Sequence, residues 1–465
     1  MISKVAFAFI AALVLSFVGI TSTSPARAAT VVESSTVANG YPKTLTFKVT
    51  AKADSNITDV TLAYAIKGRG TSALDKPKEI TPATNLSAEV VLQVNSGSSY
   101  IPVGSDFTYH WEITTADGNT FSSPEQTFFY LPPAKDWKSV SNDFMTVYYW
   151  GDREALANAY LKAGAETYDR IGKQLYGVTL GLVPVKVIMF ADEKESDEAR
   201  PGVGGRFDAA VTTCGTKVTN DIVLVIPVAC GSPDRTDTLR HEFGHILNET
   251  AGEGSLGKLP AWLDEGAAVY AQSSPGDYQS ALTAAVRANR LIPFSQMTSP
   301  ASDANLVGVF YGESWAMVSF LIQKGGNAQF AKYMSTIKSG KRYDQALTEV
   351  YGYADLAAFE NDFRASANLA PVRQATAGPT AAPTRSSQAQ PTRTPTRAPA
   401  QSTNSNSDGG GLGLGTIVIG GIAVLFALGA LFAFLISMVM ANNRATAAKT
   451  TAHSPEWRPP DEPPA

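Results

Sequence analysis

The feature that most constrains this chain is an uncharged run of 25 residues, from Thr416 to Met440, rich in Ile, Val, Leu, Phe and Ala. At 1.5 Å per residue, a helix of this length spans the hydrocarbon core of a membrane, which is about 30 Å thick. Arg444 and Lys449 follow it, as basic residues do after a segment that stops transfer. A buried core helix is the alternative, but the adjacent sequence offers no apolar core. We therefore predict one transmembrane helix at 416–440.

Residues 1–28 have the pattern of a cleaved secretory signal peptide. A lysine precedes the apolar run Val5–Ile20, and Ala26-Arg27-Ala28 is a small-residue cleavage site. An uncleaved membrane anchor is the alternative. Cleavage together with the transmembrane helix predicts a single-pass protein of the cell membrane, with the N-terminal ectodomain outside and a cytoplasmic tail at 442–465.

Residues 371–411 are predicted to form a disordered stalk between the ectodomain and the membrane. They are mainly Pro, Thr, Ser, Ala, Gln and Gly, and this composition buries too little apolar surface to fold. Inside the membrane segment, Ala423 and Ala427 form a small-xxx-small pair of the kind that packs two helices. That pattern is common in membrane helices, so it gives dimerisation no firm support.

The charge balance argues against a nucleic-acid partner. The chain has 38 Lys and Arg against 42 Asp and Glu, a formal net charge of −4. No basic excess is present to neutralise phosphates.

The two cysteines, Cys214 and Cys230, both fall in the predicted ectodomain. An oxidising compartment favours a disulfide between them. Free thiols or metal ligation are the alternatives, and two cysteines are too few for a cysteine-rich zinc site.

Residues 29–134 are predicted to form an all-β sandwich of the immunoglobulin-like or fibronectin-like type. Apolar and polar residues alternate in four segments, at 45–49, 60–64, 90–94 and 107–113. Short alternating strands at this spacing are typical of such sandwiches, although the antibody-type disulfide is absent.

Residues 140–368 show a different pattern of apolar residues. Apolar residues keep helical spacing near 161–175, two apolar strands are expected at 183–190 and 222–228, and almost everything after 233 is helical in pattern. Strands followed by a helical half predict a second domain of the α+β class.

The clearest candidate for a catalytic metal site is the segment His241-Glu242-Phe243-Gly244-His245, which lies within a predicted helix. Positions i and i+4 lie on one helix face, so both imidazoles can bind one ion. Glu242 lies about 100° around the helix from His241, where it can address a metal-bound water without being a ligand. A helix with two buried histidines and no metal is the alternative.

A catalytic zinc needs three protein ligands and one open position. The next histidine, His453, lies beyond the predicted membrane helix. Asn248 and Ala251 stand where a metzincin has Gly and His, which excludes that class. If the site holds zinc, its third ligand must therefore be a carboxylate.

Three carboxylates follow the motif. Glu249 is one helical turn further on, too far along to converge with both histidines. Asp264 and Glu265 lie in a second predicted helix that begins at Pro260. A helix that crosses the first one can bring a carboxylate of this pair to the ion.

His-Glu-x-x-His followed by Trp262-Leu263-Asp264-Glu265-Gly266-Ala267-Ala268 resembles the gluzincin zinc peptidases. These include thermolysin-like and aminopeptidase families and the peptidase MA-like domains of bacterial surface proteins. The resemblance implies one Zn²⁺ per chain, with His241, His245 and Glu265 as ligands and Glu242 as general base. Asp264 would then lie beside the ligands and hydrogen-bond a ligating imidazole.

The resemblance continues over roughly 140–367. Phe310-Tyr311-Gly312-Glu313 is similar to the family segment whose tyrosine stabilises the oxyanion, which implies that role for Tyr311. A core aromatic residue is the alternative. The Gly-Ala-Met-Glu-Asn segment of the exopeptidase members is not found, which slightly favours an endopeptidase over an aminopeptidase.

These features together predict a membrane-anchored extracellular zinc peptidase that acts on peptides or proteins. An extended substrate is expected to pair with a sheet edge near 210–215 or 221–225. One alternative is a catalytically inactive surface adhesion or sensor protein, in which the sandwich binds a partner and the zinc domain is a scaffold. Another is a zinc hydrolase that acts on a different bond. Glu242 favours the peptidase over the scaffold, because a structural zinc site needs no base.

Overall fold

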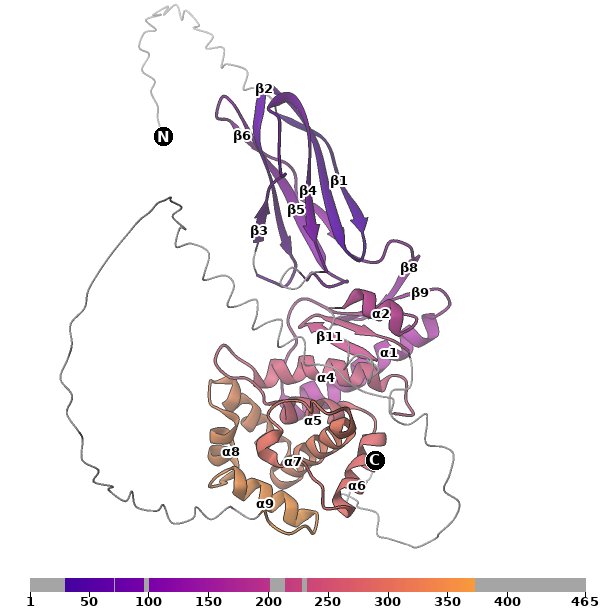
Figure 1. Ribbon diagram of the computed structural model, residues 1–465, viewed down its shortest axis with the longest axis vertical. Coiled ribbons are helices and arrows are strands. Elements are labelled where there is room, and N and C mark those ends of the chain that lie inside the picture. Colours follow the sequence, from indigo (N-terminus) through magenta and orange to yellow (C-terminus); the bar gives the residue numbers. More distant parts are fainter. Residues whose placement is uncertain (1–29, 71, 96–99, 201–213, 228–231, 373–465) are drawn as a thin grey trace, which may run out of the picture.

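The computed structural model describes residues 30–70, 72–95, 100–200, 214–227 and 232–372 (Figure 1). These form a β domain followed by a mixed α and β domain. The predicted signal peptide, the predicted transmembrane helix, the predicted cytoplasmic tail and the predicted stalk after Val372 lie outside the described residues.

The N-terminal domain consists of seven strands. They are β1 (Val31–Gly40), β2 (Thr44–Ile66), β3 (Ser72–Asp75), β4 (Ala83–Gln93), β5 (Asp106–Thr115), β6 (Thr120–Ser122) and β7 (Gln126–Phe129). The first half of β2 pairs with β1 and β4, and its second half pairs with β3 and β5. β6 and β7 complete the second layer by pairing with β5.

One long strand, β2, belongs to both layers. The rings of Phe47 and Tyr64 are 6.5 Å apart, although a straight strand would separate these residues by about 55 Å. The strand therefore bends back on itself at the register shift between Lys52 and Ile57, and its two halves face one another across the core. The prediction that 45–49 and 60–64 are separate strands is wrong in this respect, because no Gly or Pro interrupts the segment between them. The immunoglobulin-like or fibronectin-like topology stays a prediction.

The second domain begins with a five-stranded sheet. Its strands are β8 (Trp137–Ser141), β9 (Met145–Trp150), β10 (Val185–Met189), β11 (Gly215–Thr219) and β12 (Ile222–Val225), in the order β11-β12-β10-β9-β8. The three central strands are parallel, and the two outer strands are antiparallel to their neighbours. β12 is paired on both sides, so the prediction of a free sheet edge at 221–225 is wrong. Among the strands that the structure describes, β11 is the edge on that side.

Helices make up most of the rest. They are α1 (Glu154–Thr167), the π-helical η2 (Tyr168–Tyr176), α2 (Glu193–Ala199), α4 (Asp237–Gly252), α5 (Ala261–Ala271), α6 (Asp277–Arg287), α7 (Val307–Lys338), α8 (Tyr343–Tyr351) and α9 (Leu356–Ser366), with single 3₁₀ turns η3 (Phe294–Gln296) and η4 (Ala304–Leu306). α4 lies between the sheet and the C-terminal helices (Figure 1). It is therefore buried on nearly every side, and its polar residues need internal partners.

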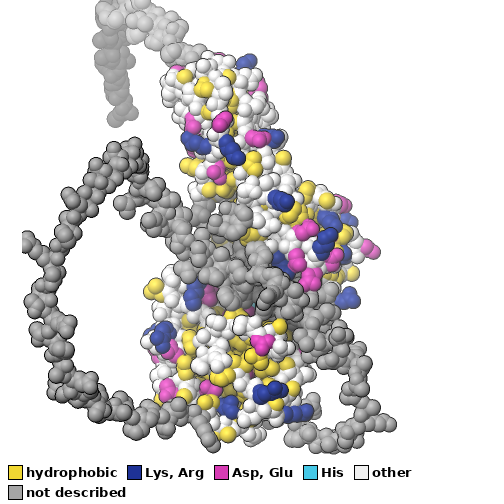
Figure 2. All heavy atoms as spheres, viewed as in Figure 1, with side chains coloured by type: hydrophobic (Ala, Val, Ile, Leu, Met, Phe, Trp, Pro, Cys, Tyr) yellow, Lys and Arg dark blue, Asp and Glu magenta, His cyan; other side chains and the backbone are white. Residues whose placement is uncertain are grey.

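Among the described residues, one helical segment, Ala304–Lys338, is long and apolar enough to cross a membrane by length and composition. Within the folded protein, 72% of the most apolar stretch of this helical segment is buried, and α5 packs along the segment. It is the central helix of the second domain. On the face shown in Figure 2, acidic and basic side chains are interspersed over both domains.

A buried ion cluster joins the two domains. Lys186 of β10 is 4% exposed, and its Nζ lies 2.8 Å from Asp221 and 3.3 Å from Asp106 of the β domain. Nearby, Tyr100 donates a hydrogen bond to the carbonyl of Ala199 at 2.7 Å. The β domain is thus fixed to the sheet of the second domain by specific polar contacts.

We expect Lys186→Met to lower the free energy of unfolding by about 3 kcal/mol, because it leaves two carboxylates facing one another at the domain junction. Lys48→Met is the matched control, since Lys48 pairs with Glu89 at 3.3 Å on the surface. That change is expected to cost less than about 1 kcal/mol. Urea unfolding of the three proteins measures both values, and equal losses would contradict a stabilising role for the cluster.

Candidate metal centre

Two crossing helices hold the predicted ligands. His241 and His245 lie on α4, and Glu265 lies on α5. The helices approach closely at Gly244, where a Cβ atom would lie 3.1 Å from the Cα of Ala268. Any larger side chain at this position would push α5 away. The glycine inside the motif therefore allows the carboxylate to reach both imidazoles.

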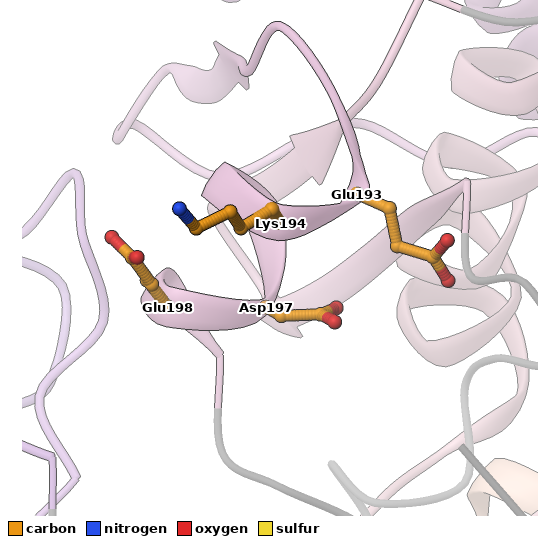
Figure 3. A pocket seen from close by; sticks show the side chains of 4 residues that line it. All are labelled: Glu193, Lys194, Asp197 and Glu198. Atoms are coloured by element: carbon orange, nitrogen blue, oxygen red, sulfur yellow. The ribbon is translucent and has the colours of Figure 1, made fainter. Parts of the chain in front are cut away.

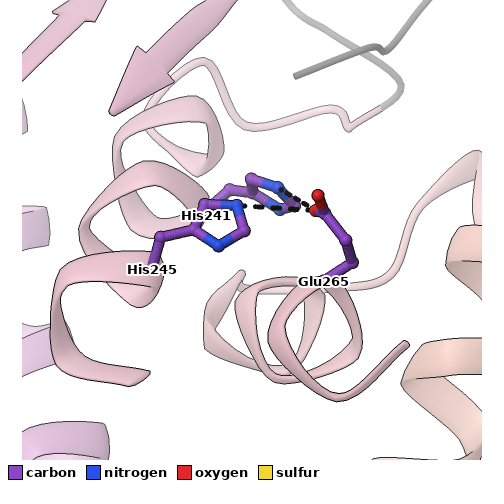
Figure 4. Close-up of side chains that lie close together, drawn as sticks. All are labelled: His241, His245 and Glu265. Atoms are coloured by element: carbon purple, nitrogen blue, oxygen red, sulfur yellow. Dashed lines mark ion pairs between the residues drawn. The ribbon is translucent and has the colours of Figure 1, made fainter. Parts of the chain in front are cut away.

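His241, His245 and Glu265 converge between the two helices (Figure 4). Each offers one ligand atom, and these atoms all lie within 4.8 Å of one another. Glu265 Oε2 is 3.4 Å from His241 Nε2 and 3.5 Å from His245 Nε2. None of the three residues is more than 3% exposed. Two imidazoles and one carboxylate form a donor set that suits zinc.

The unsatisfied atoms of this group fit a bound cation. Glu265 Oε2 and His245 Nε2 are buried and make no hydrogen bond of ordinary geometry with the described residues. Leaving such atoms unpaired in a protein interior is costly. A divalent cation would satisfy both, and three protein ligands would leave a coordination position open for water or substrate.

Glu242 lies beside the three ligands and is fully buried on α4. Its Oε2 accepts a hydrogen bond of 2.7 Å from the backbone N–H of Lys217 in the edge strand β11. Its Oε1 has no donor among the described residues. Burial raises the pKa of this carboxyl to about 8, although the charge of His245 opposes the shift. One oxygen is thus held in place, and the other is available for proton exchange. The positive charge of a bound cation would oppose the effect of burial and favour the carboxylate form that a base requires.

Asp264 orients His245. Its Oδ1 lies 3.0 Å from His245 Nδ1. Asn248 Nδ2 donates to Asp264 Oδ1 at 3.0 Å and to its carbonyl oxygen at 2.9 Å, and Tyr176 donates to Asn248 Oδ1 at 2.7 Å. This series of contacts sets the orientation of the imidazole and directs its Nε2 toward Glu265.

The two histidines differ in their electrostatic surroundings. Burial lowers the pKa of His241. Burial acts the same way on His245, but Asp264 and Glu265 outweigh it and raise the pKa of His245 well above its ordinary value. Burial alone would raise the pKa of Asp264, yet the charge of His245 and its hydrogen bond lower it to about 2. Ligation at Nε2 requires a neutral imidazole, so metal binding here must displace a proton.

Tyr311 of α7 also reaches the centre. It is 3% exposed, and its ring centroid is 6.0 Å from that of His241. Burial raises its pKa well above the ordinary value, and the charge of Glu265 and a hydrogen bond to that carboxyl add to the shift. The phenol therefore stays protonated and is a hydrogen-bond donor at the edge of the ligand group.

Sequence reasoning missed the contributions of Asn248, Tyr176 and the backbone of Lys217. The position of Asn248, three residues after His245 on one helix face, was the available signal. Lys217 also forms an ion pair with Glu249, which places that carboxylate outside the ligand group.

Cys214 immediately precedes β11 and is 1% exposed. It is not a free cysteine. Its predicted partner Cys230 lies outside the described residues, so the pairing of these two cysteines stays a prediction.

A surface hollow on α2 lies apart from the metal centre. Glu193, Lys194, Asp197 and Glu198 line it, and their side chains point in different directions rather than toward a common centre (Figure 3). This arrangement of mixed charges gives no reason to assign a ligand.

A further buried carboxyl, Glu313, lies on α7 outside the ligand group. It is 4% exposed, and its Oε2 accepts a hydrogen bond of 2.9 Å from the backbone N–H of Ile292. Burial raises its pKa to about 8, with Glu360 adding to the shift and Arg364 opposing it. Glu313 is therefore neutral in the folded protein at pH values where the unfolded chain has released its proton.

This carboxyl should make the protein less stable as the pH rises. The folded state keeps a proton that the unfolded chain loses above its ordinary pKa of 4.5, so the contribution is complete below that value and declines up to pH 8. The expected slope from this group is about 1.4 kcal/mol per pH unit. Glu313→Gln should remove this slope, whereas Glu349→Gln, at an exposed ion pair, should keep it. Urea unfolding between pH 5 and pH 8 tests this, and parallel curves for wild type and Glu313→Gln would contradict it.

Comparisons with solved structures find only distant similarities to this chain. An M1 zinc metallopeptidase from Deinococcus radiodurans is 11% identical, with 71% of this chain and 90% of that chain covered and a TM-score of 0.33. A mutant of that enzyme is 12% identical to this chain. The match covers 69% of this chain and 89% of the mutant, with a TM-score of 0.30. A polysaccharide deacetylase from Bacillus cereus is 12% identical, with coverages of 37% and 54% and a TM-score of 0.17. No curated protein matches the chain.

A family model, by contrast, matches a defined region of the sequence. The match covers residues 209–368 and begins later than the resemblance over 140–367 that the motifs indicate. The region contains the ligand group, Glu242, Asp264 and Tyr311. Residues 209–368 are thus similar to the Peptidase MA superfamily.

Proposed function

We propose that this protein is a zinc-dependent peptidase that hydrolyses peptide bonds in peptides or proteins. The observation that supports this most strongly is the buried group of His241, His245 and Glu265 with the carboxylate of Glu242 beside it. The similarity of residues 209–368 to the Peptidase MA superfamily agrees with it. Zinc, when bound, would act as a Lewis acid and make water more acidic.

The surrounding residues have distinct tasks in this reaction. Glu242 accepts a proton from the attacking water at Oε1 and passes it to the leaving amine, while the N–H of Lys217 holds Oε2. Asp264 keeps Nε2 of His245 directed at the ligand group. Tyr311 donates a hydrogen bond to the developing oxyanion.

The strand β11 is the proposed binding edge for substrate. It is an outer strand of the sheet, and its Lys217 N–H lies against Glu242. An extended peptide that pairs with this edge would lie next to the base. The missing exopeptidase glutamate segment slightly favours internal cleavage, so N-acetylated peptides should be cleaved as well as free ones.

The proposed location follows from the chain ends. The signal-like residues 1–28 and the apolar run at 416–440 support a single-pass membrane protein, with both folded domains outside the cell. A stalk at 371–411 would hold them away from the membrane surface.

Metal removal tests the function directly. The purified full-length protein should contain one zinc per chain and cleave members of a broad peptide library. A chelator should abolish cleavage, and added zinc should restore it. One zinc without any cleavage would favour the scaffold or the non-peptidase hydrolase, and a protein that binds no zinc would exclude the assignment.

A further inference from the structure

A second tyrosine, Tyr278 at the start of α6, packs on Tyr311 beside the metal centre. Its ring is stacked on that of Tyr311, with centroids 5.2 Å apart and planes 22° from parallel, and Tyr311 in turn lies against His241. The helices touch here without intervening side chains, because a Cβ atom on Gly312 would lie 2.3 Å from the carbonyl oxygen of Tyr278. The position of the second ring is therefore fixed by close packing.

The hydroxyl group of Tyr278 is buried without a partner. The residue is 4% exposed, and its Oη has no hydrogen bond within the part of the chain that the structure describes. Burying a hydroxyl without a hydrogen-bond partner is destabilising, and a phenylalanine would avoid this cost.

Burial, with a smaller effect of nearby charges, keeps this hydroxyl protonated. Burial raises the pKa of Tyr278 well above its ordinary value, and the charges of Glu265, Asp277 and Glu242 raise it further. Two of these three carboxylates belong to the metal centre, so the phenol is within electrostatic reach of it. A protonated phenol at this place has a hydrogen to donate and no acceptor among the described residues.

We propose that Tyr278 is a further substrate-binding residue, whose hydroxyl donates a hydrogen bond to the substrate carbonyl oxygen that becomes negatively charged during hydrolysis; this rests on the peptidase function proposed above. Tyr278 and Tyr311 then form a stacked pair of donors on one side of the ligand group. Because the bond strengthens as charge develops, it lowers the barrier more than it stabilises bound substrate.

Tyr333 provides a matched control within the same fold. It is fully buried, and its Oη also lacks a partner in the described ranges. Its ring contacts Phe330 and Tyr351 and no member of the metal centre. Tyr278→Phe and Tyr333→Phe therefore remove the same atom from the same kind of environment, and they differ in their distance from the site.

The test uses the zinc-loaded full-length protein. Turnover is measured on a peptide that the wild type cleaves, and binding of an alanine-rich phosphinic peptide, whose tetrahedral anion mimics the oxyanion, is measured by calorimetry. For Tyr278→Phe we expect kcat to fall on the order of 100-fold with little change in KM. The phosphinic peptide should bind more weakly by a similar factor, with zinc content unchanged and the melting temperature no lower than that of the wild type. Tyr333→Phe should match the wild type in turnover, phosphinate binding and zinc content.

If the wild type is active, two outcomes would overturn this role. Equal turnover and equal phosphinate binding in the two variants would show that Tyr278 is a core residue, and loss of zinc in Tyr278→Phe would make its role structural. A wild type that cleaves nothing would contradict the peptidase function instead. In that case, selective loss of phosphinate binding in Tyr278→Phe would still support the donor, and absence of binding to the wild type would remove it.

Discussion

Glu242→Gln is expected to reduce peptide turnover by about 1,000-fold or more while the zinc content stays the same. The amide has the shape of the carboxyl, and its oxygen can still accept the 2.7 Å hydrogen bond from the N–H of Lys217. It has no basic oxygen to take a proton from water. Turnover on a cleavable peptide and zinc content by atomic absorption measure the two effects separately.

Glu249→Gln is the control for this change. Glu249 lies on the same helix, forms an ion pair with Lys217 and is not part of the ligand group. This variant should keep zinc and most of its turnover. If Glu242→Gln were as active as Glu249→Gln, Glu242 would not be the base and the mechanism proposed here would be wrong.

The second large effect is expected at the ligands. Glu265→Ala removes one of three donors and should leave a protein that retains no zinc after dialysis. Its melting temperature should no longer respond to added zinc, because a metal stabilises only a fold that binds it. Zinc content and thermal unfolding with and without added metal measure both consequences.

Asp264→Asn gives a graded comparison with Glu265→Ala. The substitution keeps all three donors but weakens the contact at 3.0 Å that orients His245. Loss of such a supporting contact weakens metal binding by about 10- to 100-fold rather than abolishing it. A competition assay with a coloured chelator would resolve the difference. If Asp264→Asn lost zinc completely and Glu265→Ala kept it, the roles of the two neighbouring carboxylates would be reversed.

The ligand group illustrates what sequence can predict. Helical periodicity alone places His241 and His245 on one face, because the spacing of four residues determines it. The choice between Asp264 and Glu265 required either the family resemblance or the crossing of α4 and α5. That crossing depends on Gly244 packing against Ala268, a tertiary contact that no local pattern contains.

Other features depend on long-range packing in the same way. Tyr278 begins an amphipathic helix and has the sequence signature of an ordinary core aromatic residue; only its stacking on Tyr311 reveals the site. The strand β11 has no strong apolar alternation, since Gly215, Thr216 and Lys217 occupy most of it. Its place is set by pairing with β12. The bend in β2 could not be predicted from local sequence. The residues Asp54 to Asn56 favour a turn that would end a strand, but here they lie at a register shift inside one continuous strand.

The ion cluster around Lys186 has a consequence for which parts of this protein can be produced separately. Asp221, which it binds, lies in the turn that joins β11 to β12, so the β domain supports the same strand that touches Glu242. A chain shortened to its C-terminal domain would expose this ammonium group and the apolar surface around it to solvent. Such a fragment should aggregate during expression, so both domains need to be produced together.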